Sequence, residues 1–104
     1  MRYNLTSTSL EELMNDNTES QIRMYSTDWC PDCIRAKAVM RRLKVAYTEI
    51  DVDKDPEGYQ VVVEYNSGKR IVPTIFFPDG SVLVEPSNKA LTEKLVELGL
   101  VGNR

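Results

Sequence analysis

Two cysteines, Cys30 and Cys33, are the residues of this chain whose type and spacing most directly suggest chemistry. No other cysteine occurs in its 104 residues. A Cys-x-x-Cys pair can cycle between a dithiol and a disulfide. Cysteines at i and i+3 on a helical turn meet the Cα separation of about 4.4–6.8 Å that the bond requires. The pattern therefore predicts a redox-active dithiol.

Half of a zinc site, or a pair of inert core thiols, is the alternative for these cysteines. Because the chain contains no histidine, a zinc site within one chain would need two carboxylates as its remaining ligands. The absence of histidine also excludes every mechanism that depends on an imidazole base. We therefore expect a redox pair and no metal site.

The two cysteines are expected to have different roles. Pro31 suits the first position of a helix, so Cys30 would lie at the helix start and face the mouth of the site. There the unpaired N–H groups and the helix dipole favour a thiolate. Cys33 would lie on the buried face. Cys30 would attack a target disulfide, and Cys33 would then release the target by attacking Cys30.

Neighbouring side chains are expected to tune the pair. A carboxylate at Asp32 disfavours a second negative charge and would make the protein more reducing than a relative with tyrosine or histidine there. Asp32 also suits the first turn of a helix. Arg35 and Lys37 would favour the thiolate if they reach the mouth. Trp29 has two open interpretations, contact with the thiol or substrate and simple cover for the core.

Composition predicts one soluble globular domain, because 41% of the residues are hydrophobic and 28% are charged. A net charge of −3 gives no reason to expect nucleic acid or an anionic membrane as a partner. No stretch approaches the roughly 18–20 apolar residues of a membrane span, and residues 1–6 lack the apolar run of a signal peptide. We expect a cytoplasmic monomer, where permanent structural disulfides are rare.

The elements that would position the pair follow from hydrophobic periodicity. Residues 21–26 favour a strand, and a helix is expected from Pro31 to Lys44. Its buried face would consist of Cys33, Ala36, Val39, Met40 and Leu43. A second strand is expected at 46–52. A helix is expected at 57–66, because Asp55-Pro56 is typical of a helix start, although Val61-Val62-Val63 also suits a strand.

Further elements are expected at both ends of the chain. Residues 74–77 and 82–84 favour a hairpin around the turn at 78–81. A last helix would begin at Ser87 or Asn88 and bury Leu91, Leu95 and Leu98. Residues 3–6 favour a strand, and Thr8 and Ser9 each stand three residues before a glutamate, as at a helix start. The early strands should be parallel, and the hairpin should add an antiparallel edge.

With its elements in this order, the chain resembles the thioredoxin superfamily, and most closely its glutaredoxin-like branch, which includes the mycoredoxins. The likeness rests on Trp29-Cys30-Pro31-Asp32-Cys33, on Val72-Pro73-Thr74, and on Pro78-Asp79-Gly80 with Pro86-Ser87-Asn88. It spans about residues 21–98, whereas a strand and helix within residues 1–20 would be thioredoxin-like. The resemblance implies an α/β thioredoxin fold in a single domain, residues 1–104, with four to five strands in a mixed sheet flanked by three to four helices.

The resemblance also implies a cis Val72–Pro73 bond facing the cysteines, with the backbone of Val72 open to an extended peptide or thiol ligand. The helix start after Pro86 and the loop before Val72 would bind the carboxylates of a small thiol such as glutathione or mycothiol. The thiol-binding residues so expected are Lys69, Arg70, Val72, Pro73, Thr74, Ser87 and Asn88. A solvated loop is the alternative for Lys69 and Arg70.

The expected function is that of a thiol–disulfide oxidoreductase acting on protein disulfides or on mixed disulfides with small thiols. It would hold no cofactor tightly and would take electrons from glutathione, mycothiol or a flavoprotein reductase. One alternative is an iron–sulfur cluster carrier that uses Cys30 in a dimer. Another is a thioredoxin-type redoxin that depends on a reductase. The intact cysteine pair argues against a redox-inactive interaction domain.

Overall fold

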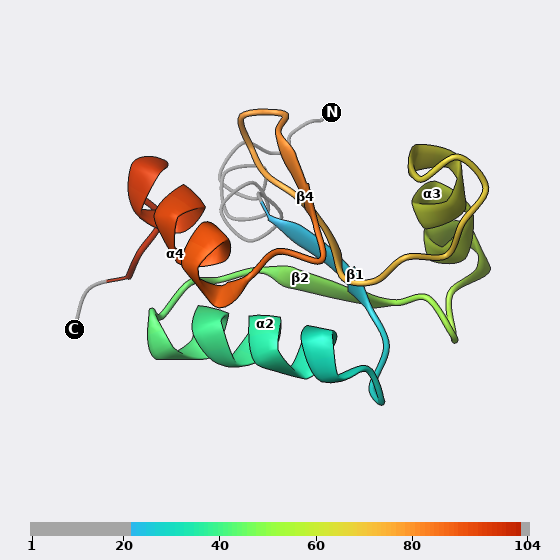
Figure 1. Cartoon of the computed structure of the whole chain (residues 1–104), viewed down its shortest axis with the longest axis horizontal. Helices are drawn as coiled ribbons and strands as arrows, with labels where there is room; N and C mark the ends of the chain where they lie inside the picture. The colour runs from blue at the N-terminus through green and yellow to red at the C-terminus, as the bar shows by residue number, and fades with distance from the viewer. Residues whose placement is uncertain (1–21, 103–104) are drawn as a thin grey trace, which may run out of the picture.

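The computed structural model describes residues 22–102 (Figure 1). The strand expected at 3–6 and the helix expected from Thr8 or Ser9 lie outside the described residues. The elements are β1 (Arg23–Ser26), α2 (Pro31–Arg42), β2 (Thr48–Asp51), α3 (Pro56–Tyr65), β3 (Thr74–Phe76), β4 (Val82–Val84) and α4 (Asn88–Glu97). Their order is the one predicted from residue 21 onward. Within residues 22–102, no helix is long and apolar enough to cross a bilayer.

The strands form one mixed sheet in the order β2-β1-β3-β4. β1 and β2 are parallel, and they are joined through α2. β3 is antiparallel to β1 and forms the predicted hairpin with β4. The central strand β1 therefore pairs on both sides, with Met24 opposite Glu49 on β2 and opposite Ile75 on β3.

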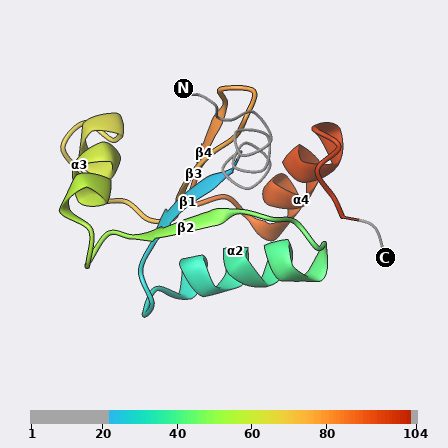
Figure 2. The ribbon, with the colours of Figure 1, turned by 180° about the vertical axis from the view of Figure 1, so that it is seen from behind.

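Helices cover both faces of this sheet. Successive side chains on a strand point to opposite faces, so Met24 and Tyr25 face different layers. Met24 belongs to a buried cluster with residues of α2 and α4, and Tyr25 to a second cluster with Val62 of α3. Both views show α2 and α4 adjoining each other, with α3 well apart from α4 (Figures 1 and 2). The arrangement is a thioredoxin fold, as expected.

The larger cluster forms most of the hydrophobic core, and the smaller cluster includes both cysteines. The larger cluster consists of Ile22, Met24, Ala36, Val39, Met40, Val45, Ile75, Phe77, Leu91 and Leu95. The smaller one consists of Tyr25, Cys30, Cys33, Val52, Val62 and Val72. Both cysteines, at the start of α2, are thus buried among apolar side chains.

Residues 61–63, which the pattern left open between helix and strand, are helical because of the cap that begins their helix. The side chain of Asp55 accepts hydrogen bonds from the backbone N–H groups of Glu57 and Gly58, at 3.0 and 3.1 Å. This cap fixes a helix start ahead of the three valines, and the burial of Val62 then stabilises the helix. The β-branched run at 61–63 is therefore helical. Gly58 is required by packing, because a Cβ there would lie 2.5 Å from the Cγ2 atom of Ile50.

Candidate active site

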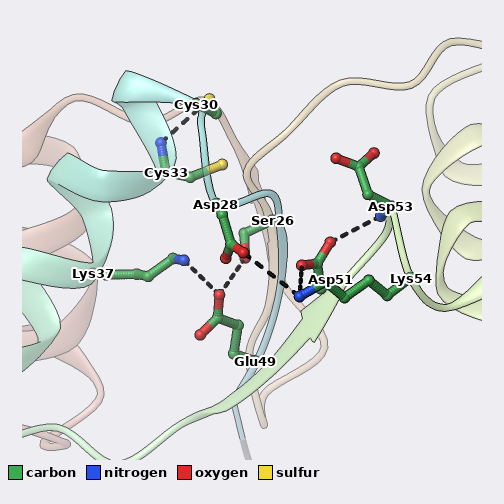
Figure 3. A network of polar contacts seen from close by, with 9 residues as sticks. All are labelled: Ser26, Asp28, Cys30, Cys33, Lys37, Glu49, Asp51, Asp53 and Lys54. Atoms are coloured by element: carbon green, nitrogen blue, oxygen red, sulfur yellow. Dashed lines mark hydrogen bonds and ion pairs between the residues drawn. The ribbon is translucent and has the colours of Figure 1, made fainter.

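Cys30 is the N-cap residue of α2. Its backbone is extended, with φ −81° and ψ 121°, and its carbonyl accepts the hydrogen bond from Ile34 N–H that begins the helix. Its sulfur accepts a hydrogen bond from the backbone N–H of Cys33 at 3.4 Å (Figure 3). A helix start leaves N–H groups unpaired, and one of them here points at the Cys30 sulfur. The position can therefore stabilise negative charge on that sulfur.

Cys33 lies one turn further along α2 and is completely buried. Burial raises the pKa of its thiol to about 12, and the Cys30 sulfur raises that pKa as well. A backbone hydrogen bond from Thr27 and the charge of Lys37 act in the opposite direction. In the dithiol state Cys33 therefore stays a thiol at neutral pH, and it cannot make the first attack on a substrate.

Cys30 is less open than we expected. It is only 8% exposed, against 0% for Cys33, so both cysteines are buried. Its thiol approaches the backbone carbonyl of Val72, with 3.8 Å between sulfur and oxygen. The Val72–Pro73 peptide bond is cis, as the resemblance implies. The Val72 backbone therefore lies directly at the cysteine, where a substrate chain would have to approach.

Trp29 is held beside the cysteines but does not cover the core. Its side chain is 60% exposed, which rules out the interpretation of a core-covering residue. The indole N–H donates a hydrogen bond to the Asp53 carboxylate at 2.8 Å, and the guanidinium carbon of Arg70 lies 5.3 Å from the ring centroid. Arg70 is thereby brought to the same surface as Cys30. Arg70 is itself an exposed loop residue.

Asp32 is paired with Arg35, which also connects it to the last helix. A guanidinium nitrogen of Arg35 lies 2.8 Å from the Asp32 carboxylate, and a second nitrogen donates to the Asn88 side-chain oxygen at 3.2 Å. The first turns of α2 and α4 are thus connected by one side chain. The Asp32 charge is partly neutralised, so its effect on the neighbouring sulfur is smaller than that of an isolated carboxylate.

The remaining predicted residues lie in three kinds of environment. Lys69 is exposed, whereas Pro73 is buried. The Thr74 hydroxyl points inward and donates to the Ile71 carbonyl at 2.7 Å, so it fixes the loop and is not open to a ligand. The Ser87 hydroxyl accepts a hydrogen bond from Ala90 N–H at 3.0 Å and caps α4. Ser87, and not Asn88, is the N-cap residue.

Lys37 forms a polar cluster next to the cysteines with Ser26 and Glu49, two residues that the sequence did not single out. The Lys37 ammonium group donates a hydrogen bond to the Glu49 carboxylate, and the buried Ser26 hydroxyl donates to the same carboxylate oxygen at 3.0 Å (Figure 3). We expected Lys37 to favour the thiolate if it reached the mouth of the site. Only 18% of its side chain is exposed, and it points across to β2. Its position four residues after Cys33 could have indicated that the two side chains share one face of the helix.

The family of the chain follows from comparison with known proteins. A family profile described as glutaredoxin matches residues 22–83, a span that includes both cysteines and the cis proline. The chain belongs to the glutaredoxin family. It is accordingly a glutaredoxin-like thiol–disulfide oxidoreductase. Within residues 22–102, no three histidine, cysteine, aspartate or glutamate side chains are grouped so that they could hold a metal ion.

Individual relatives and solved structures show the same likeness. Mycoredoxin 1 of Corynebacterium glutamicum is 36% identical over 80 residues, which is 76% of this chain and 98% of that protein. The crystal structure of a T8A mutant of a thioredoxin-like protein superposes with a TM-score of 0.60 at 28% identity, covering 79% of this chain and 97% of the other. The glutaredoxin of Archaeoglobus fulgidus gives a TM-score of 0.59 at 26% identity, covering 71% of this chain and 84% of that one. Glutaredoxin and thioredoxin-like structures thus share this sheet and helix arrangement.

Proposed function

We propose that the chain reduces mixed disulfides between proteins and small thiols, with Cys30 as nucleophile and Cys33 as resolving residue. The observation that carries the proposal is the difference between the two sulfur atoms. The Cys30 sulfur receives an N–H from the helix start, whereas burial holds the pKa of the Cys33 thiol near 12. Only one of the two is suited to react first as a thiolate.

The first step uses the helix start and the loop at Val72. A substrate disulfide would lie against the Val72 backbone, whose carbonyl is 3.8 Å from the Cys30 sulfur. The thiolate attacks one sulfur of that disulfide, a bond forms to Cys30, and the other sulfur leaves as a thiolate. Trp29 and Arg70 offer an apolar face and a positive charge beside this position. They suit a small thiol that carries carboxylates.

The second step uses proximity. Cys33 is on the same helical turn as Cys30, so it can attack the mixed disulfide without rearrangement of the backbone. Alternatively, a second small thiol attacks Cys30 from outside, and Cys33 is then not needed. The two routes differ in their dependence on Cys33, and the difference can be measured.

A small thiol is the proposed electron donor. The resemblance to glutaredoxins and mycoredoxins implies such a donor, and this chain matches 98% of the length of mycoredoxin 1. Mycothiol and glutathione are therefore the two donors to compare first, and a flavoprotein reductase is the third. The proposal places the protein in the cytoplasm, where thiol systems keep cysteine pairs reduced.

One turnover assay tests the proposal. The oxidised protein is offered mycothiol, glutathione, or thioredoxin reductase with NADPH, and the thiols formed are counted by alkylation and mass spectrometry. We expect a small thiol to reopen the Cys30–Cys33 bond. Reopening by the reductase alone would contradict a small-thiol donor.

Two variants assign the cysteines. Cys30→Ser should remove all activity towards a glutathionylated or mycothiolated peptide. Cys33→Ser should retain it through the external-thiol route and lose reduction of disulfides within one protein. Equal loss in both variants would contradict the assigned roles.

A further inference from the structure

A charged pair lies beside the buried cysteine. Lys37 follows Cys33 by four residues on α2, so the two side chains share one face of the helix. The ammonium group is bonded to Glu49 on β2, and Ser26 on β1 holds the same carboxylate oxygen at 3.0 Å. With 18% of the Lys37 side chain exposed, this charge is screened by water far less than a surface lysine.

In the resolving step the Cys33 sulfur must carry a negative charge, although its burial disfavours that charge. The Cys33 thiol must lose its proton to solvent, and the resulting thiolate attacks the Cys30 sulfur. The Cys30–Cys33 bond forms, the bond from Cys30 to the target sulfur breaks, and the target leaves with the electron pair as a thiolate that takes up a proton from solvent. Burial of Cys33 disfavours the attacking thiolate. A nearby positive charge can offset this cost.

We propose that Lys37 is a positioning residue for the resolving step: its charge, held beside Cys33 by Glu49 and Ser26, stabilises the Cys33 thiolate and sets the rate of target release. The inference rests on the proposed roles of the two cysteines. Glu49 has two opposing effects on the Cys33 thiolate. It anchors the ammonium group at β2, and its negative charge weakens the field that Lys37 exerts on Cys33.

The other groups around Cys33 offer no equivalent charge. The charged or titratable side chains that surround it are Cys30 and Lys37 on α2, Glu49 on β2, Tyr25 on β1 and Asp28 in the loop after β1. The Tyr25 hydroxyl accepts a hydrogen bond from Arg23, and Asp28 is paired with Lys54 at 3.7 Å. The layer towards α3 contributes Val62 and Val72, which are apolar. The Lys37 charge lowers the pKa of Cys33, whereas Cys30 raises it.

Sequential kinetics separate the two steps. The reduced full-length protein is mixed with a symmetric nitrobenzoate disulfide, each half of which is coloured when released. The first phase of colour reports attack by Cys30, and the second reports resolution by Cys33. Both are followed by stopped flow from pH 5 to pH 9 in wild type, Lys37→Met, Lys37→Arg and Glu49→Gln.

The expected changes are confined to the second phase. Lys37→Met should slow it about tenfold at pH 7, since a rise of one unit in the pKa of Cys33 lowers its thiolate fraction tenfold. Lys37→Arg should stay within about twofold of wild type because it keeps the charge. Glu49→Gln should speed the second phase at pH 7, because glutamine removes the negative charge but keeps an oxygen that can accept the hydrogen bond from Lys37. The first phase should change by less than about twofold in all variants.

Lys94→Met is the matched control. Lys94 is also 18% exposed in its side chain, but its ion-pair partners are Asp79 and Glu97. Loss of this lysine should leave both phases unchanged. An unaltered second-phase rate in Lys37→Met, or the same change in Lys94→Met, would overturn the inference. If Lys37→Met does not fold, the absence of a faster second phase in Glu49→Gln overturns it instead. A wild-type protein without a second phase would contradict the proposed roles of the cysteines, which is a different outcome.

Discussion

Arg70 lies over the indole ring of Trp29, with its guanidinium carbon 5.3 Å from the ring centroid. The edge of the same ring is fixed by the hydrogen bond from its N–H to Asp53. A ring held at its face and at its edge, yet 60% exposed, presents a fixed surface beside Cys30. Trp29 and Arg70 can therefore bind a ligand without first being ordered, which lowers the entropic cost of binding.

Arg70→Ala should weaken binding of a small-thiol mixed disulfide. An exposed ion pair between Arg70 and a ligand carboxylate would contribute about 0.2–1 kcal/mol, so KM should rise by up to about fivefold while kcat stays within about twofold. Trp29 is the only tryptophan in the chain, and its fluorescence should change in the same variant. Lys69→Ala is the control, because Lys69 is exposed and precedes Arg70 directly. An equal rise in KM in both variants would show that general positive charge is sufficient.

Asp32→Tyr should make the protein a weaker reductant. Removal of the carboxylate favours the Cys30 thiolate, stabilises the dithiol form and moves the reduction potential to a less negative value. Because Arg35 partly neutralises Asp32, the shift should stay below about 30 mV, which is about 1.4 kcal/mol for this two-electron couple. Arg35→Met should move the potential in the opposite direction. Equilibration with a glutathione buffer measures the reduction potential of both variants. Shifts of the same sign would contradict the proposed effect of the Asp32 charge.

Ser87→Asp separates the capping role of Ser87 from its proposed role in ligand binding. Aspartate is a good N-cap residue, so stability should be kept, but its charge should repel a ligand carboxylate and raise KM. Ser87→Ala should lower the free energy of unfolding by about 1 kcal/mol. Asp55→Ala, which removes the cap of α3, should reduce stability without altering KM. An unchanged KM in Ser87→Asp would place the ligand carboxylates elsewhere.

The Lys37–Glu49 pair should make stability depend on pH in a defined window. The hydrogen bond from Lys37 lowers the pKa of Glu49 below 4.5, although burial acts against this. Burial acts to lower the pKa of Lys37, but the bond and charge of Glu49 raise it above 10.5. The Glu49 contribution is therefore present above about pH 4.5 and is lost as the pH falls through its folded pKa. The Lys37 contribution is present below about pH 10.5 and is lost as the pH rises through its folded pKa.

Chemical denaturation of wild type and Glu49→Gln between pH 2 and pH 11 measures this window. The stability difference should be largest between the two limits and should not exceed about 1 kcal/mol, because water screens the partly exposed carboxylate. Glu93→Gln is the control, since Glu93 forms an exposed pair with Lys89. A difference that persists below the folded pKa of Glu49 would show that the pair is not its source.

Local patterns predicted most of the fold. Asp55-Pro56 marks a helix start through its own side chain, and the buried face from Cys33 to Met40 follows from helical spacing. The segment at 61–63 stayed open because β-branched residues suit both a buried helix and a strand. The cap of Asp55 and the burial of Val62 against the sheet decided between them.

The candidate site was less predictable, because its contacts join distant parts of the chain. The cysteines could be identified by spacing alone. The contact between Arg70 and Trp29 and the bond between Lys37 and Glu49 depend on how β2 and the loop before β3 lie next to the start of α2. No local pattern encodes these relations. A lysine on a helix is usually solvated, so no local pattern indicates that Lys37 points to Glu49 on β2.

The sulfur atoms share a packed layer with three valines, Val52, Val62 and Val72. Valine methyl groups give sharp, well-separated NMR signals, and their chemical shifts respond to neighbouring atoms. A change from dithiol to disulfide alters the surroundings of all three at once. Selective methyl labelling would therefore let an observer follow the redox state of this protein from inside its core, without a dye and without altering either cysteine.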